Sequence, residues 1–262
     1  MPYKPTVTRK KYAPLLRRLA RLTEDTAKSL RELRKPNVPD KILLAFLGKA
    51  ADTLRGMLAL QKEGLCHETQ ALARTLFELR LSFDAFAEML AADVSAACKR
   101  VMDTVLLEKV KQARASNFKG FDLIPGAPTP DDLNETEEQI AKRYPPAELK
   151  RLKQYGITGL NVEQRAKRSG LSNEYNIAYR NFSRNVHSTD FTELLLQEDP
   201  DLISSNLDSY LESRDAVCCE IAFISAAGIA TRVNDMARLR LDRRFAALWK
   251  ACDAVRRATS AG

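Results

Sequence analysis

Hydrophobic residues recur along most of the chain at the three- and four-residue spacing of amphipathic helices. Near the N-terminus they form one stripe, with arginines and lysines mostly off it: Tyr12, Leu15, Leu16, Leu19, Leu22, Leu30 and Leu33. Pro36 and Pro39 are expected to end this helix, and Asp40 to cap a second one that runs towards Gly64. No stretch shows the sustained two-residue alternation of a β-strand, so the pattern predicts helices only.

Prolines and glycines divide the rest of the chain. Residues 117–130 are rich in both and predict a loop, and Thr129-Pro130 reads as the start of the next helix. Pro145 and Pro146 interrupt that helix and allow a restart to Tyr155, and Ser172 is expected to cap a segment at 173–187. Helices are further predicted over 67–90, 94–115, a short stretch ending at Gly170, 207–239 and 243–257.

The fold class that follows is all-α, a multi-helix bundle with a more irregular helical middle section. We expect one helical domain over 1–262, with the loop at 117–130 as its candidate sub-boundary. The helix at 207–239 should be central, and these side chains should be largely buried: Val217, Ile221, Ile224, Ile229, Leu76 and Phe77. Its apolar run at 216–230 contains Glu220 and is shorter than the roughly 18 residues of a membrane span. It therefore predicts a buried core helix and no membrane span.

The composition is that of a globular protein, with 45% hydrophobic and 29% charged residues in a chain of 262. The 5 cysteines are odd in number and scattered, without a C-x-x-C pair, and only 2 histidines could supplement them. This favours neither a disulfide framework nor structural zinc, and it suits a reducing cytoplasm. Residues 1–11 contain no apolar leader. We expect a cytoplasmic protein that needs no metal or cofactor.

Charge is concentrated at the two ends. Residues 1–35 hold 11 basic and 3 acidic side chains, and residues 232–262 hold 8 and 3, around a middle with net charge −5. Basic ends of this kind attract polyanions such as RNA or an anionic membrane surface. They are equally typical of solvated helix faces. The sequence leaves both interpretations open.

A polar stripe marks the segment at 173–187. At 100° per residue, its members share a sector of about 100°: Asn176, Arg180, Ser183, Arg184 and His187. An adjacent apolar face carries Tyr175, Tyr179, Phe182 and Val186. Because the polar stripe lies beside the core face, we expect it at the edge of a groove or inside the bundle, where its groups need partners.

A second polar stripe, on the helix at 67–90, contains His67, Arg74 and Glu78. If the two helices are neighbours, Glu78 can pair with Arg180 or orient His187. The plainer alternative is a structural i, i+4 pair between Arg74 and Glu78, with His187 favoured by a helix dipole. We predict that Arg74, Glu78, Arg180 and His187 converge, and that loss of Glu78 costs a few kcal/mol if the pair is buried.

These residues resemble a bacterial all-helical family of unknown function, the 5677 family. The resemblance lies in Leu72-Ala73-Arg74-Thr75-Leu76-Phe77-Glu78 and in Tyr175…Tyr179-Arg180…Ser183…Val186-His187, and it covers about 50–225. It implies that five residues belong to one shared feature: Arg74, Glu78, Tyr179, Ser183 and His187. It supplies no activity.

Arg180-Asn181 followed by five residues and His187 is similar to the motif of HEPN ribonucleases. Those proteins are helical bundles, often dimeric, that act in toxin–antitoxin and phage-defence systems and cleave RNA without a metal. The resemblance implies RNA as substrate, a homodimer, and a partner protein such as an antitoxin. It implies a catalytic set of Arg180, His187, Glu78 and Arg74, supported by Tyr179, Ser183, Arg184 and Asn181.

Two other functions remain open at this stage. The chain can be a non-catalytic binding module that holds a small anion, a nucleotide or a partner helix, or an interaction protein whose Arg/Glu/His cluster is a satisfied polar core. The motifs G-x-S-x-G, H-E-x-x-H, the P-loop and the glycine-rich dinucleotide loop are all absent. Kinase, dehydrogenase and metalloprotease functions are therefore excluded.

Overall fold

The computed structural model describes residues 6–63, 65, 68–115, 129–179, 182 and 207–260, and these contain helices and no strand. The elements are α1 (Val7–Leu33), α2 (Val38–Lys62), α3 (Thr69–Ala92), α4 (Val94–Ala115), α5 (Pro130–Ala141), α6 (Pro146–Tyr155), η2 (Gly156–Thr158), α7 (Val162–Arg168), α8 (Ser172–Glu174), the π-helical turn η3 (Tyr175–Tyr179), α11 (Leu207–Ala237) and α12 (Asp242–Ser260). The all-α prediction is confirmed.

The chain divides into two compact units. The first consists of residues 1–83 and 169–262, and the second of residues 84–168. The loop predicted at 117–130 falls within the range of the second unit, and residues 116–128 lie outside the described part of the chain. A single helical domain over 1–262 stays a prediction.

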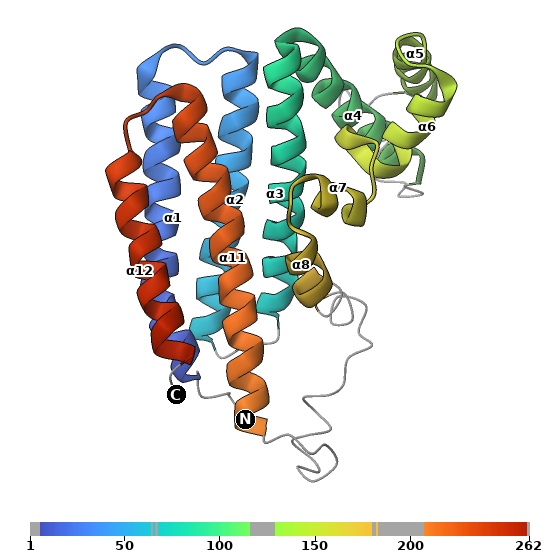
Figure 1. Ribbon diagram of the computed structural model, residues 1–262. Coiled ribbons are helices and arrows are strands. Elements are labelled where there is room, and N and C mark those ends of the chain that lie inside the picture. The colour runs from blue at the N-terminus through green and yellow to red at the C-terminus, as the bar shows by residue number, and fades with distance from the viewer. Residues whose placement is uncertain are drawn as a thin grey trace. The chain divides into compact units, whose positions relative to one another are not determined.

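The first unit is a bundle of long helices in which α1, α2, α3, α11 and α12 run side by side (Figure 1). Helix α11 packs against α1, α2 and α12, and its buried face is rich in small residues, among them Ala222, Ala226 and Ala230. Small side chains let neighbouring helix backbones approach closely, while Phe223 fills the remaining space. Helix α11 is therefore the central helix, as predicted.

The predicted core is confirmed at Leu76, Phe77, Ile221 and Ile229, which are buried. Val217 and Ile224 are covered less completely than these four and keep a minor part of their surface exposed. These two residues are seven apart and so share one face of α11. Arg80 of α3 covers part of that face, where its Nη1 donates to the Ile224 carbonyl oxygen at 3.4 Å.

Helix α11 is also long and apolar enough to cross a membrane. Over Leu211–Ala237 it reaches a mean hydropathy of 1.6, so the expectation that its apolar run is too short for a span is wrong. Within the protein, however, 61% of that window is buried. This burial is consistent with the predicted core helix and with the absence of a membrane span.

Two helix caps differ from the sequence prediction. Asn37 is the N-cap of α2 and Asp40 is its third residue, and the two form a reciprocal capping box. Ser172 is the first residue of α8 rather than its cap, and the residue before it, Leu171, makes no side-chain cap. The predicted cap at Thr129 is confirmed, since its hydroxyl accepts from the Asp132 backbone N–H.

The second unit packs short helices against α4 around a small core of Leu107, Ile140 and Leu152. Asp103 of α4 accepts from the Tyr144 hydroxyl at 3.0 Å and forms an ion pair with Arg143. Burial and this carboxylate raise the pKa of Tyr144 to about 12. The Asp103 network therefore fixes the segment between α5 and α6 to α4.

Candidate functional site

The predicted pair on α3 forms in the structure. Arg74 and Glu78 lie one turn apart, and the Arg74 Nε donates to the Glu78 Oε1 at 3.0 Å. Leu76 and Phe77 point into the core, which leaves this pair on the remaining side of the helix. The local i, i+4 interaction is confirmed.

Tyr179, from η3, completes the cluster. The Arg74 Nη2 donates to the Tyr179 hydroxyl oxygen at 2.8 Å, and the guanidinium carbon lies 4.5 Å from the centre of the Tyr179 ring. Tyr175 stacks on the same ring with centroids 5.1 Å apart. Arg74 thus holds Tyr179 by a hydrogen bond and a cation–π contact, and it joins α3 to η3. We call Arg74, Glu78 and Tyr179 the α3 cluster.

Residues Tyr175–Tyr179 are π-helical, whereas the sequence analysis assumed an α-helix there. A π-turn closes its hydrogen bonds over five residues instead of four, so the angle between successive side chains falls below 100°. Of the polar stripe only Asn176 lies in this turn, so the sector of about 100° for the whole stripe stays a prediction. Single π-turns are frequent at functional sites, which makes this departure from regular geometry relevant to the α3 cluster.

The α3 cluster is only partly covered, with 17% of the Arg74 side chain and 36% of the Glu78 side chain exposed. The Arg74 Nη1 has no hydrogen-bond partner within the described part of the chain. Burial and the nearby Glu78 carboxylate raise the pKa of Tyr179, so this hydroxyl stays protonated at neutral pH. The cluster therefore combines a partly exposed arginine side chain, whose buried Nη1 has no hydrogen-bond partner among the described residues, with a neutral phenol.

Five predicted site residues lie outside the described residues: Arg180, Asn181, Ser183, Arg184 and His187. Their predicted convergence with Glu78 stays a prediction. The aromatic residues on either side of Arg180-Asn181 are described, and both are packed: Tyr179 against Arg74, and Phe182 in the core. The predicted His67 also lies outside the described residues.

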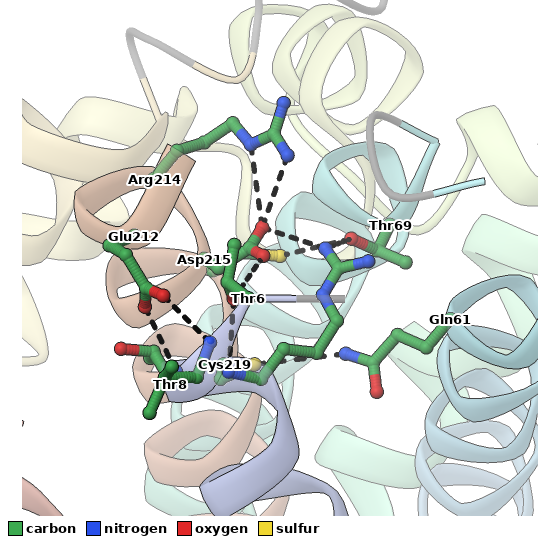
Figure 2. Close-up of polar contacts among 11 residues, drawn as sticks. Thr6, Thr8, Gln61, Thr69, Glu212, Arg214, Asp215 and Cys219 are labelled. Atoms are coloured by element: carbon green, nitrogen blue, oxygen red, sulfur yellow. Dashed lines mark hydrogen bonds and ion pairs between the residues drawn. The ribbon is translucent and has the colours of Figure 1, made fainter. Parts of the chain in front are cut away.

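A second arginine cluster, which the sequence analysis missed, lies inside the bundle (Figure 2). The Arg9 Nη2 of α1 contacts the Asp215 Oδ1 of α11 at 2.7 Å, with 2% and 1% of the two side chains exposed. Arg214 approaches the same oxygen at 3.3 Å, and the Thr6 hydroxyl donates to the other carboxylate oxygen at 2.8 Å. Thr69 of α3 also accepts from Arg9, at 3.4 Å. We call Thr6, Arg9, Thr69, Arg214 and Asp215 the buried cluster.

The buried cluster continues at the start of α1. Glu212 accepts from the backbone N–H groups of Val7 and Thr8, at 2.6 and 2.9 Å, and so satisfies two donors of the first turn. Arg9 and Asp215 are 206 positions apart in sequence, so no local pattern links them. The available signal was Asp215 itself, a carboxylate inside the apolar α11 that needs a buried partner.

Two thiols lie beside the buried cluster. The Cys218 Sγ is 3.5 Å from the Thr69 hydroxyl, and the Gln61 amide donates to the Cys219 Sγ at 3.7 Å. Burial raises the pKa of Cys218 to about 11 and that of Cys219 well above its usual range. Both thiols are therefore protonated and poorly reactive at neutral pH. Among the described residues, no group of three or more His, Cys, Asp and Glu side chains is placed to hold a metal ion.

Comparison with known proteins gives one match. The profile of a family of unknown function (DUF5677) matches residues 40–202, which is more than half of the chain. The matched region contains the α3 cluster and the Arg180…His187 motif, and it excludes α1 and α12. No curated protein matches the chain, and no solved structure does.

Proposed function

The chain belongs to this family of unknown function (DUF5677), and we propose that it is a metal-independent endoribonuclease of the HEPN type. In this proposal Arg180 and His187 act on the RNA backbone. The resemblance that motivates it also implies a homodimer, and a role in toxin–antitoxin or phage-defence systems with a partner protein. The free, buried cysteines of the described chain suit a cytoplasmic site of action.

The observation that carries the proposal is the anchoring of Tyr179, the residue directly before Arg180. Arg74 holds Tyr179 by a 2.8 Å hydrogen bond and a cation–π contact, and Glu78 holds Arg74. Phe182 is buried two residues beyond Arg180. The described residues on either side of Arg180-Asn181 are therefore both packed against the bundle, which supports a role for this segment that needs defined geometry.

The residue types suit cleavage through the RNA 2′-hydroxyl. Neutral His187 takes the 2′-OH proton as the 2′-oxygen attacks the phosphorus, and the bond to the 5′-oxygen breaks. The 5′-oxygen leaves with a proton from water or an acid group, and the other product ends in a 2′,3′-cyclic phosphate. Arg180 stabilises the negative charge that develops on the phosphate. No metal or redox partner is needed for this balance.

Within this proposal the α3 cluster positions the motif. Glu78 fixes the Arg74 guanidinium, and Arg74 fixes Tyr179, so the geometry of the following residues depends on α3. Asn181, Ser183 and Arg184 are proposed as supporting donors to the RNA.

A non-catalytic binding module is the second candidate. The specific observation in its favour is the Arg74 Nη1, which has no hydrogen-bond partner among the described residues. A buried guanidinium nitrogen without a partner costs free energy, and an anionic ligand would supply the missing acceptor. If this second function is correct, RNA or another anion should bind to the protein and should not be cleaved.

The experiment is incubation of the purified protein with mixed RNA in excess EDTA. The proposal expects cleavage that survives EDTA and is lost in His187→Ala. The chain has 2 histidines, so His67→Ala is a matched control that should keep the activity. Binding of RNA without cleavage would favour the binding module. Cleavage abolished by EDTA would overturn the metal-independent mechanism.

A further inference from the structure

A pocket rich in arginine lies in the first unit, between α1 and α12. Its volume is about 340 Å³, and its lining residues are Arg18, Arg21, Leu22, Arg243, Arg244, Ala247 and Leu248. The two helices lie side by side (Figure 1), and both fall outside the region that the family profile matches. The pocket is therefore separate from the α3 cluster and from the feature that the family shares.

Most of the positive charge in this pocket is uncompensated. Arg244 is paired with Asp25, whose Oδ2 lies 2.5 Å from its Nη2. Arg18, Arg21 and Arg243 have no carboxylate partner in the part of the chain that the structure describes. Because these side chains are exposed, water and salt screen the repulsion among them, and an anion in the pocket would remove what repulsion remains.

The helix positions of these arginines place them around one space. Arg18 and Arg21 are three residues apart and so share one face of α1, and the buried Leu22 follows Arg18 by one turn at the edge of that face. On α12, Phe245 and Leu248 are buried, which turns the preceding arginines outward. The guanidinium groups of the two helices therefore face a common space, above a floor formed by Leu22 and Leu248.

The turn that begins α12 is held rigidly. The buried Asn234 side chain donates to the Asp242 Oδ1 and accepts from the Leu241 backbone N–H, both at 2.9 Å. Arg238 and Arg240 adopt the left-handed backbone region, with φ of 53° and 61°, which is strained for a residue with a side chain. Asn234 thus maintains a costly turn that sets where Arg243 and Arg244 begin.

We propose that this pocket binds a compact oligophosphate, such as the di- or triphosphate group of a nucleotide. Guanidinium groups form paired hydrogen bonds with phosphate oxygens, and several of them can share one chain of phosphates. A single carboxylate would leave most of the charge unmet, and a cation would be repelled. The volume falls in the range of small-ligand pockets, which suits a small anion better than a long polymer.

The test measures the binding of inorganic tripolyphosphate to the full chain. Titration calorimetry gives the affinity, and thermal unfolding with and without the ligand gives the stabilisation. We expect saturable binding and a raised unfolding midpoint, beyond the effect of sulfate at the same ionic strength. In the triple variant R18A/R21A/R243A the affinity should fall about tenfold or more. R31A removes an exposed arginine of α1 outside the pocket and should leave the affinity unchanged.

Two further measurements distinguish an oligophosphate site from a purely structural role of these arginines and from the proposed ribonuclease site. Without ligand, the triple variant should be at least as stable as the native chain, because repulsion is removed. H187A should bind tripolyphosphate normally, whatever becomes of the proposed cleavage. Equal affinity in the triple variant, or stabilisation no greater than that by sulfate, would overturn the proposal. The proposal would also be overturned if single-stranded RNA bound through these arginines and tripolyphosphate did not bind.

Discussion

The two clusters built around Arg9 and Arg74 use the same residue type in opposite environments. Arg9 and Asp215 are 2% and 1% exposed and are surrounded by hydrogen-bonding groups from three helices. Arg74 and Glu78 are 17% and 36% exposed, and a tyrosine covers one face of the guanidinium. The first pair is closed to ligands, whereas the second is partly exposed and leaves the Arg74 Nη1 without a hydrogen-bond partner among the described residues.

This difference assigns different roles to the two clusters. A buried ion pair is costly to form and far costlier to break, so it fixes which helices pack together. A partly exposed pair adds little to stability and can be retained for what it positions or binds. The buried cluster therefore serves the packing of α1, α3 and α11, and we propose that the α3 cluster serves the proposed function instead.

The largest expected effect is that of breaking the buried pair. Asp215→Ala leaves Arg9 without its carboxylate inside the bundle and should lower the free energy of unfolding by about 3–5 kcal/mol. Chemical denaturation monitored by circular dichroism measures this loss. Asp253→Ala is the matched control, because its ion pair with Arg256 is half-exposed and should be worth less than about 1 kcal/mol. Equal losses in the two variants would remove the contrast between buried and exposed pairs.

Glu78→Gln should change the free energy of unfolding little and RNA cleavage strongly, the opposite of Asp215→Ala. If the Arg74–Glu78 pair were buried, loss of Glu78 would cost a few kcal/mol of unfolding free energy. With 36% of the Glu78 side chain exposed, we now expect less than about 1 kcal/mol. RNA cleavage should nevertheless fall about tenfold, because Arg74 loses the group that orients it. A stability loss as large as that of Asp215→Ala would show instead that the α3 cluster is structural.

Tyr179→Phe sharpens the comparison by removing a single oxygen. The variant keeps the ring that covers Arg74 and loses the 2.8 Å hydrogen bond between Arg74 and the Tyr179 hydroxyl. The free energy of unfolding should fall by about 0.5–1.5 kcal/mol, measured by the same denaturation. Tyr175→Phe serves as the comparison, since the same chemical change is made on the ring stacked beside it. An unchanged free energy of unfolding in Tyr179→Phe would mean that a water molecule replaces the Tyr179 hydroxyl as the partner of Arg74 without loss of stability.

The smallest expected effect is on the titration of Tyr179. Burial raises its pKa above the ordinary 10, and the Glu78 carboxylate raises it further, so Glu78→Gln should lower it. Because the folded-state pKa is raised, this group favours folding fully below pH 10 and loses that contribution as the pH rises through its folded pKa. NMR of ring-labelled tyrosine, assigned with Tyr179→Phe, follows the titration. An unchanged pKa in Glu78→Gln would place the carboxylate away from the hydroxyl.

Local signals account for what the sequence predicted well. The bounds 94–115 match α4, and the restart from Pro146 to Tyr155 matches α6, because prolines and caps act within a few residues. The Arg74–Glu78 pair was predictable for the same reason, since it lies within one helical turn.

Long-range contacts and irregular helical turns could not be predicted from the sequence. The Arg9–Asp215 pair joins residues 206 positions apart, and Arg9 looked like one more charge of a basic terminus. The π-turn at Tyr175–Tyr179 escaped because a fixed angle of 100° per residue was imposed on that segment. Hydropathy also could not show that Val217 and Ile224 are less completely covered than Ile221 and Ile229, because the cover of each face of a buried helix depends on its neighbours.

The most direct test of the central claim is the chemical end of the RNA product. In EDTA, the native chain should leave a 2′,3′-cyclic phosphate on a defined RNA, and a single 2′-deoxy substitution at the cut site should abolish that cut. His187→Ala and Arg180→Ala should each slow the reaction by on the order of 10² or more while the helical circular dichroism is unchanged. Cleavage that persists in the Arg180→Ala, His187→Ala double variant, or that cuts the 2′-deoxy substrate equally well, would contradict the account.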